Sequence, residues 1–329
     1  YMTSFNFGTH TDTSSITDMS GMFRACERLP TVNLSTLNTS SVTNFSRMFE
    51  EMMRRTPGGA GIDVSNLDTS SGINFSYMFS SMSYLTSLDV SNFDTSNATS
   101  MSSMFYSMFG VTSLDVSNFD TSNVQYMDSM FSSCFALSSL DVSNFVTTNV
   151  TYMNAMFSGT NAIAVINVSN FDTSNVIYFS GMFRLNSNNN RSDIIGVENF
   201  DFEAINQTNS LTDFITEFAL PTSRYDQLLI NIDAQTIAQT TQADFGNSQY
   251  TAGGAAEAAR ANIISTNGWT ITDGGALLAP FAMTVRTTSA SETFTIPAQD
   301  VGTFNASVDW GDGSTSTVTT YNDADLAHT

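Results

Sequence analysis

The sequence predicts an α/β repeat protein, a solenoid in which a parallel β-sheet lies opposite short helical turns. The first observation is a recurring Met-Phe pair, which begins at Met22, Met48, Met78, Met104, Met130, Met156 and Met182. Successive pairs are 26 residues apart, except for one step of 30 residues. The second observation is the phrase LDVSNFDTSN, which starts at Leu88 and again at Leu114. The third is a switch between two hydrophobic periodicities within each unit, which predicts one strand and one helical turn.

Each unit is expected to begin with a short strand. In SLDVSNF, Leu114 and Val116 alternate with Asp115, the pattern of a strand with one buried face. The DTSN residues that follow favour a turn, and their side chains can cap a helix. An apolar stripe at spacings of three and four then predicts one α or 3₁₀ turn, formed by Val124, Met127, Met130 and Phe131. Stacked units would place the strands on one wall and the helical turns on the other.

Several repeated residues are expected inside the stack. The methionines are interpreted as flexible core filler rather than as a copper or partner site. We predict an aromatic stack of Phe93, Phe119, Phe145 and Phe171. The preceding asparagines should form an amide ladder that satisfies backbone groups of neighbouring coils, and they are Asn92, Asn118, Asn144 and Asn170. Cys26 and Cys134 lie four repeats apart, very roughly 20 Å, which predicts two free and mostly buried thiols.

The chain is expected to contain three domains. Residues 1–218 hold about seven to eight repeats, the last one degenerate and preceded by the LNSNNNRSD insertion, a predicted surface loop. Residues 219–279 should form an α/β cap, with AAEAARANIIS as a helix, GWTITDGG as a strand and Trp269 plugging the last apolar coil. Residues 280–329 alternate strand and turn patterns, as in part of a β-sandwich.

The residue between the two buried strand positions points to solvent. With the serine two positions later, it forms an exposed polar row that we predict to be the binding surface. This row consists of Asp89, Ser91, Asp115, Ser117, Asp141, Ser143, Asn167 and Ser169. Carboxylates about 5 Å apart repel one another unless cations such as Ca²⁺ or hydrogen bonds intervene. Because the row lacks the ligand alternation of calcium repeats, hydrogen bonds from the neighbouring serines are the favoured interpretation.

Two other acidic sets have structural interpretations. A second row lies in the turns, where helix capping or Asx turns account for it, and it consists of Asp68, Asp94, Asp120 and Asp172. In VDWGDGS, Asp309 and Asp312 could bind calcium, but shaping a tight hairpin is the favoured role. No other cofactor is expected.

Composition excludes several classes of function. The formal net charge is -21, so nucleic acid and anionic lipid would be repelled. There is no run of about 18 apolar residues, which argues against membrane insertion of this segment. The only histidines are His10 and His328, at opposite ends of the chain, so a Ser-His-Asp set is not expected and the protein is predicted not to be an enzyme.

The LDVSNFDTSNV motif followed by the Met-Phe pair closely resembles the 26-residue repeat of BspA-like surface proteins, a leucine-rich-repeat-like group. The resemblance covers about residues 2–214, and Leu67 departs from it by replacing a phenylalanine. It implies a right-handed solenoid exposed on a cell or virion surface. VDWGDGS resembles an element of PKD-like modules of the immunoglobulin type, which implies that residues 280–329 are part of such a sandwich.

The function expected from these observations is non-enzymatic adhesion or recognition outside the cell, through the exposed polar face of the solenoid. The alternative is a structural subunit or spacer of a filament, surface layer or phage fibre that assembles by self-association. The expected partner is therefore a surface glycan or protein, or further copies of the chain.

Overall fold

The computed structural model describes residues 5, 12–29, 32–52 and 61–277, and four short strands beyond residue 293. The chain forms two compact units, Tyr1–Leu277 and Leu278–Thr329. The proline- and glycine-containing stretch MRRTPGGA, which falls within the 30-residue step of the repeat, lies outside the described residues.

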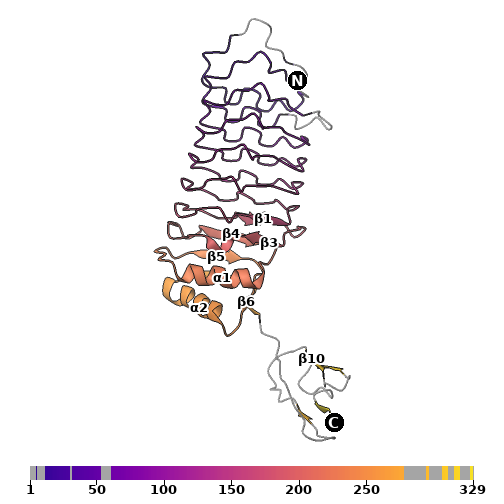
Figure 1. Cartoon of the computed structure of the whole chain (residues 1–329), viewed down its shortest axis with the longest axis vertical. Helices are drawn as coiled ribbons and strands as arrows, with labels where there is room; N and C mark the ends of the chain where they lie inside the picture. The colour runs from indigo at the N-terminus through magenta and orange to yellow at the C-terminus, as the bar shows by residue number, and fades with distance from the viewer. Residues whose placement is uncertain are drawn as a thin grey trace. The chain divides into compact units, whose positions relative to one another are not determined.

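The first unit is α/β, with parallel sheets and few helices (Figure 1). Its helices are α1 (Thr222–Asp233), α2 (Ala255–Asn267) and the 3₁₀ helix η1 (Val197–Asn199). Its strands are β1 (Val165–Asn167), β2 (Phe183–Arg184), β3 (Asp193–Ile195), β4 (Leu211–Thr216), β5 (Gln242–Phe245), β6 (Tyr250–Thr251), β7 (Thr270–Thr272) and β8 (Ala276–Leu277). The described strand pairs of the first unit are parallel: β1 pairs with β3, β6 with β8, and one sheet has the order β2-β4-β5-β7.

Between Asp12 and Phe183, successive repeats form coils that lie side by side (Figure 1). Residues one repeat apart are joined by isolated parallel bridges, which run through Asp18, Asn44, Asn74, Ser100, Tyr126, Tyr152 and Tyr178. Backbone hydrogen bonds follow the same register, for example from the N–H of Ser129 to the carbonyl of Asn154 at 2.8 Å. One sequence repeat therefore corresponds to one coil.

The strand predicted in each unit forms only in part. Around Leu114 the structure has a single bridge, from Ser113 to Ser139, and a regular strand of this wall first appears at β1. Side chains form hydrogen bonds with backbone groups that would otherwise pair with a neighbouring β-strand. The Asp115 carboxylate accepts a hydrogen bond from the Ser117 N–H at 3.0 Å, and the Asn144 amide donates to the Val116 carbonyl at 3.0 Å.

The apolar stripe does not form the predicted helical turn. The N–H groups of Met127 and Ser129 donate to the next coil, whereas that of Met130 donates back to the carbonyl of Met127 at 3.3 Å. Ser129 has a left-handed backbone with φ of 55°, as position three of a type II turn requires. In an α-helix these N–H groups would donate to carbonyls of the same helix. Here they donate to the neighbouring coil, so a turn forms in place of the helix.

The methionines of the repeated pair are core residues, as predicted. From Met48 to Met182 each of them is fully buried, whereas Met22 is exposed. Cys134 is buried and Cys26 half-buried, and both thiols are free, so only Cys26 is less enclosed than expected.

The predicted aromatic stack belongs to a different column of phenylalanines. The rings of the Met-Phe pairs follow one another with centroids 5.6–6.0 Å apart, through Phe23, Phe49, Phe79, Phe105, Phe131, Phe157 and Phe183. Phe119 lies against Phe105 at 6.2 Å, and the equivalent rings of Phe93, Phe145 and Phe171 also pack beside this stack. The prediction that the second column stacks on itself was wrong. The Met-Phe rings stack because hydrogen bonds between the turns hold their backbones at coil spacing.

The amide ladder is confirmed. Asn118 donates to the carbonyls of Val90 at 3.1 Å and Phe93 at 2.8 Å in the preceding coil. Asn92, Asn144 and Asn170 make the same pair of bonds. Because a buried carbonyl without a partner is costly, one asparagine per coil stabilises two such groups.

A buried threonine in each coil forms another ladder, which sequence reasoning missed. The Thr95 hydroxyl donates to the carbonyl of Asp120 at 2.9 Å and accepts from its N–H at 2.9 Å. The same pair of bonds is made by Thr39, Thr69, Thr121, Thr147 and Thr173. The motif DTSN was interpreted as a turn whose side chains can cap a helix, because a polar threonine gives no sign in the sequence that it points inward.

The segment after the repeats continues their packing. Val197, Phe200, Leu211 and Phe214 of the degenerate repeat are buried. Helix α2, strand β7 and the buried Trp269 agree with the prediction, and the indole N–H donates to the carbonyl of Gln239 at 3.2 Å. Helix α1 was not predicted, although Tyr225, Leu228, Leu229 and Ile232 are buried along it at helical spacing. Arg224 of α1 pairs with Asp193 and Glu198, which joins the helix to the last repeats.

The insertion before the degenerate repeat is not wholly a surface loop. Leu185 and Arg191 are buried. The Arg191 guanidinium donates to the carbonyls of Ile163 at 3.0 Å and Thr160 at 3.1 Å. The loop is thus anchored by one arginine that caps carbonyls of the preceding coil.

In the second unit, β10 (Ala306–Asp309) and β11 (Thr315–Val318) pair antiparallel, with Asp309 opposite Thr315. This pairing is that of the expected hairpin. The strands β9 (Phe294–Thr295) and β12 (Ala327–His328) also pair antiparallel. Asp312, predicted to shape the hairpin, lies outside the described residues.

Candidate binding surface

All of the predicted surface residues are exposed. Asp89, Ser91, Asp115, Ser117, Asp141, Ser143, Asn167 and Ser169 occur at equivalent positions of four successive coils. Asp63 is exposed at the same position one coil earlier. We call Asp63, Asp89, Asp115 and Asp141 the aspartate row. It places one carboxylate on each coil, at a spacing of about 5 Å.

Each carboxylate of the aspartate row is held by the serine two residues later. The Ser91 N–H donates to Asp89 Oδ1 at 3.0 Å, and Ser117 and Ser143 bind Asp115 and Asp141 in the same way. Serine donors therefore fix Oδ1, and Oδ2 is left for solvent or a ligand. The predicted Asp–Ser hydrogen bonding is confirmed.

These hydrogen bonds lower the carboxyl pKa of Asp89 and Asp115, because the serine donors bind the ionised form. The neighbouring carboxylate of Asp89 acts in the opposite direction and raises the pKa of Asp115. The row is therefore ionised at neutral pH, and its members repel one another. The ion pairs found among the described residues lie elsewhere, at arginines 24, 47, 184, 224 and 260.

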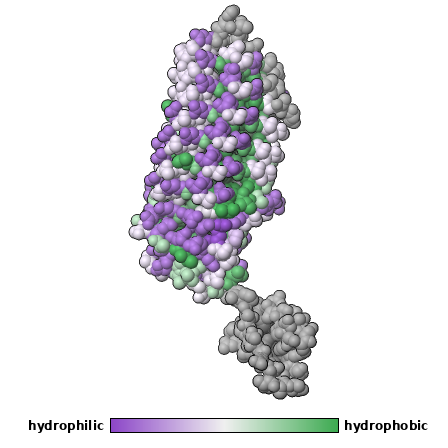
Figure 2. All heavy atoms as spheres, in the orientation of Figure 1, coloured by the Kyte–Doolittle hydropathy of each residue, from purple (hydrophilic) through white to green (hydrophobic). Residues whose placement is uncertain are grey.

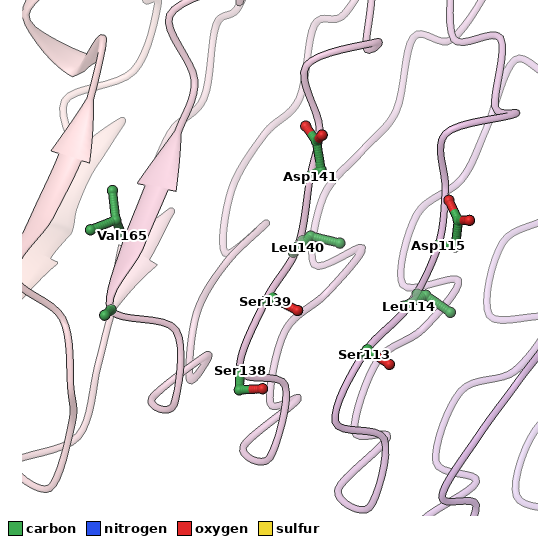
Figure 3. Close-up of a pocket in the computed structure, with 9 residues that line it drawn as sticks. Ser113, Leu114, Asp115, Ser138, Ser139, Leu140, Asp141 and Val165 are labelled. Carbon is green, nitrogen blue, oxygen red and sulfur yellow. The ribbon is translucent and has the colours of Figure 1, made fainter.

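A shallow depression of about 530 Å³ opens beside Asp115 and Asp141 (Figure 3). Three neighbouring coils line it, through Ser113, Leu114, Asp115, Ser138, Ser139, Leu140, Asp141, Ala164 and Val165. Figure 3 shows the carboxylates of Asp115 and Asp141 at equivalent places on adjacent coils, with Val165 on the next coil. Val165 is 43% exposed and Leu140 is half-buried, so the depression has an aliphatic lining beside its carboxylates.

The aliphatic part of this surface was missed from the sequence. Val165 stands where the preceding coils carry Ser113 and Ser139, a departure visible in AVINVSNF when it is aligned with SSLDVSNF. The sequence analysis assigned no role to this departure. Only the arrangement of three coils brings the valine next to carboxylates that lie 24 and 50 residues earlier in the chain.

Two stacked aromatic pairs lie outside the depression, and all their rings are exposed except that of Tyr152, which is half-buried. Phe109 and Phe135 are 42% and 41% exposed, and their ring centroids are 5.3 Å apart. Tyr126 and Tyr152 stack at 5.6 Å on the turn that follows the second acidic row. Figure 2 shows hydrophilic residues over much of the visible face of the first unit, with apolar residues gathered along one side.

The second acidic row forms the predicted Asx turns. Ser96 N–H and Oγ both bind Asp94 Oδ1, and the equivalent N–H bonds are made to Asp68, Asp120 and Asp172. Among the residues that the structure describes, there is no group of three or more His, Cys, Asp or Glu side chains suited to hold a metal ion. Of the calcium candidates, Asp309 is described only as part of β10 and Asp312 lies outside the described residues.

The free cysteines have environments unsuited to nucleophilic chemistry. Burial raises the pKa of the Cys134 thiol to about 12, and its S–H donates to the carbonyl of Phe105. Desolvation also raises the pKa of Cys26. Both thiols are therefore protonated at neutral pH. In the described part of the chain, none of the helices has the length and apolar character needed to span a membrane.

Comparison with known proteins finds one family. Residues 2–106, 60–139 and 134–244 match the family described as Mycoplasma protein of unknown function, DUF285. No curated protein and no solved structure matches the chain. The matched ranges together extend over the repeats and into the segment that follows them, well over half of the sequence. The chain therefore belongs to the DUF285 family, a repeat family of the kind that the BspA-like motif implied.

Proposed function

We propose that this chain is a non-enzymatic extracellular repeat protein that acts in adhesion or recognition. The observation that carries the proposal is the aspartate row, in which one exposed and hydrogen-bonded carboxylate recurs on each coil. A surface with a regular repeat suits a ligand with a regular repeat, because several weak contacts act together through effective concentration. Membership of a repeat family of surface-protein type supports this proposal.

The architecture that we propose is a right-handed, leucine-rich-repeat-like solenoid. The regular offset of the hydrogen bonds between coils and the continuous phenylalanine stack support it. Residues 219–279 would cap the array, and residues 280–329 would belong to an immunoglobulin or PKD-like sandwich. The antiparallel pairing of β10 with β11 is in keeping with such a module.

The proposal places the chain on a cell or virion surface, with no catalytic role and no obligatory cofactor. Its partner is a surface glycan or protein, whereas nucleic acid and membrane lipid are disfavoured by the net charge of -21. Calcium at Asp309 and Asp312 is a separate possibility of the second unit, and the adhesion proposal does not depend on it.

A second candidate function is a structural subunit or spacer that assembles from copies of itself. The exposed Phe109–Phe135 pair favours it, since contiguous apolar surface commonly marks a protein interface. In that case the contact would be made by aromatic residues and the aspartate row would face solvent.

The test displays the whole chain on beads and measures retention on immobilised matrix proteins and on a glycan array. The variant Asp89→Asn/Asp115→Asn/Asp141→Asn is compared with Phe109→Ser/Phe135→Ser, and sedimentation velocity reports self-association of each. Retention that is lost only in the aspartate variant supports adhesion. Assemblies that dissociate only in the phenylalanine variant, with no retention on any surface, would establish the structural alternative instead.

A further inference from the structure

We propose that the depression beside Asp115 and Asp141 docks a basic, extended polypeptide segment, whose lysine or arginine stems lie on Val165 and Leu140. This inference rests on the proposed function and names the chemical class of its partner. The segment would follow the coil stacking direction and place cationic groups along the aspartate row.

The negative charge of the depression indicates that its partner is positively charged. Two carboxylates lie in the lining of the depression, and Asp89 and Asp63 continue the row on the preceding coils. Each of these carboxylates accepts a hydrogen bond at Oδ1 from the N–H of the serine two residues later. Its Oδ2 is therefore available to a cationic partner. The ion pairs of the described residues involve other acidic groups. The charge of the aspartate row is therefore not neutralised within these residues, and a cationic partner would neutralise it.

The same charge argues against a second copy of the chain as the occupant. The chain has a net charge of -21, and its few basic residues are arginines without any lysine. Two aspartate rows placed face to face would bring like charges together, which opposes association through this surface. A partner of opposite charge is therefore the complementary one.

The aliphatic lining distinguishes a peptide from a sugar. Val165 and Leu140 offer methyl groups, on which the methylene stem of a lysine or arginine can pack while its charged end reaches a carboxylate. The lining has no aromatic ring of the kind that proteins use to stack against sugars, and the exposed aromatic pairs lie elsewhere on the first unit. The serine hydroxyls of Ser113 and Ser139 add hydrogen-bonding capacity to the same surface.

The experiment titrates the full chain with a 12-residue peptide of alternating lysine and valine, using isothermal titration calorimetry at about 50 mM salt. We expect Asp89→Asn/Asp115→Asn/Asp141→Asn to weaken binding by at least about tenfold, since it removes several exposed charge pairs. The matched control Asp68→Asn/Asp94→Asn/Asp120→Asn changes the charge equally but lies outside the depression, and it should weaken binding less than about threefold. Equal losses in both variants would overturn the proposal, because they would indicate unspecific attraction to a negative protein.

A second pair of variants tests the aliphatic lining. Val165→Ser should weaken peptide binding by about threefold or more, since part of its apolar contact is lost. Val146→Ser removes a valine of nearly equal exposure, 44% against 43%, at a place outside the depression, and it should have no effect. If Val165→Ser left the affinity for the peptide unchanged, docking in the depression would be refuted.

A chitosan hexamer titrated in parallel separates the two kinds of cationic chain. Tighter binding of the aminosugar than of the peptide would overturn the peptide assignment and leave adhesion through the aspartate row intact. Failure of the adhesion proposal has a different signature: bead retention in the earlier test would then not depend on the aspartate variant at all.

Discussion

The coils of the repeat region and the closing segment, residues 219–277, satisfy their buried polar groups in different ways. In the coils, one asparagine and one threonine per repeat bind backbone groups of the neighbouring coil. In the closing segment, α1, α2 and parallel strands use their own backbone bonds, and partly buried ion pairs join α2 to the strand end and α1 to the last repeats. Asp273, for example, accepts from Arg260 Nε at 2.7 Å and from the Tyr225 hydroxyl at 2.6 Å.

This difference shows what a short repeat needs in order to fold without regular helices. A coil with its chain reversed every few residues leaves many carbonyls unpaired, and each would be costly in the interior. The fixed side-chain ladders remove that cost, and the phenylalanine stack supplies the apolar burial. The closing segment is not built from these coils, and there regular helices and charged pairs provide the partners of the polar groups.

The largest effect is expected in the phenylalanine stack. Phe131→Ala should lower the free energy of unfolding by about 3–5 kcal/mol, because it removes a fully buried ring that contacts Phe105, Phe145 and Phe157. Urea unfolding followed by far-UV circular dichroism measures it. Phe109→Ala, which removes an exposed ring, serves as the control. A comparable loss in both variants would contradict the assignment of the stack as the core.

The free energy of unfolding of the closing segment should depend on the ion pair between Arg260 and Asp273 to a similar or slightly smaller degree. Arg260→Ala leaves the carboxylate of Asp273, whose side chain is only 2% exposed, without its cation, and should cost about 3 kcal/mol. Hydrogen exchange should show the loss within α1 and α2 and not in the coils. The control is Arg184→Ala, which breaks an exposed pair with Asp213 and should have little effect.

The threonine ladder gives an intermediate effect. Thr121→Val preserves shape but leaves the N–H and carbonyl of Val146 without their partner, and should cost about 1–3 kcal/mol. Thr121→Ser keeps the hydroxyl and should retain most of the stability. If valine were tolerated as well as serine in urea unfolding, the ladder would not stabilise the coils in the way described.

Acid should destabilise the coils through the carboxylates of their turns. Hydrogen bonds from Ser96 and Ser122 lower the carboxyl pKa of Asp94 and Asp120, so their folded pKa lies below the unfolded value of about 3.9. Their contribution is therefore present above about pH 4 and is lost as the pH falls through the folded pKa. We expect a lower urea midpoint at about pH 3 than at about pH 6, and a smaller difference for Asp94→Asn/Asp120→Asn. A midpoint that rises on acidification would contradict the sign.

The smallest effect on stability is expected in the aspartate row. Asp115→Asn keeps an oxygen for the Ser117 N–H and changes no buried contact, so the urea midpoint should stay the same within error. Unfolding of this variant would show that the row is structural, which would remove the reason to treat it as a binding surface.

Much of the fold could be predicted because repetition makes burial visible. Leu114, Val116 and Phe131 recur at fixed positions, and their burial follows from hydrophobic spacing alone. Helix α2 was predicted from its alanine-rich sequence, whereas α1 was overlooked although Leu228 and Ile232 lie on one helical face. The candidate surface could be predicted only as a row of exposed residues. The aliphatic depression depends on Val165, which lies on a different coil from the carboxylates beside it.

The coil period, the buried apolar positions and the exposed position of each aspartate can be read from the amino-acid sequence, because they depend on local hydrophobic spacing. Three other features depend on the packing of the coils: turns replace helices, the Met-Phe rings form the continuous stack, and Thr95 and its equivalents point inward. The physical reason is competition for hydrogen bonds. Once coils lie side by side, a backbone N–H can bind either its own turn or its neighbour, and that choice depends on residues a full repeat away.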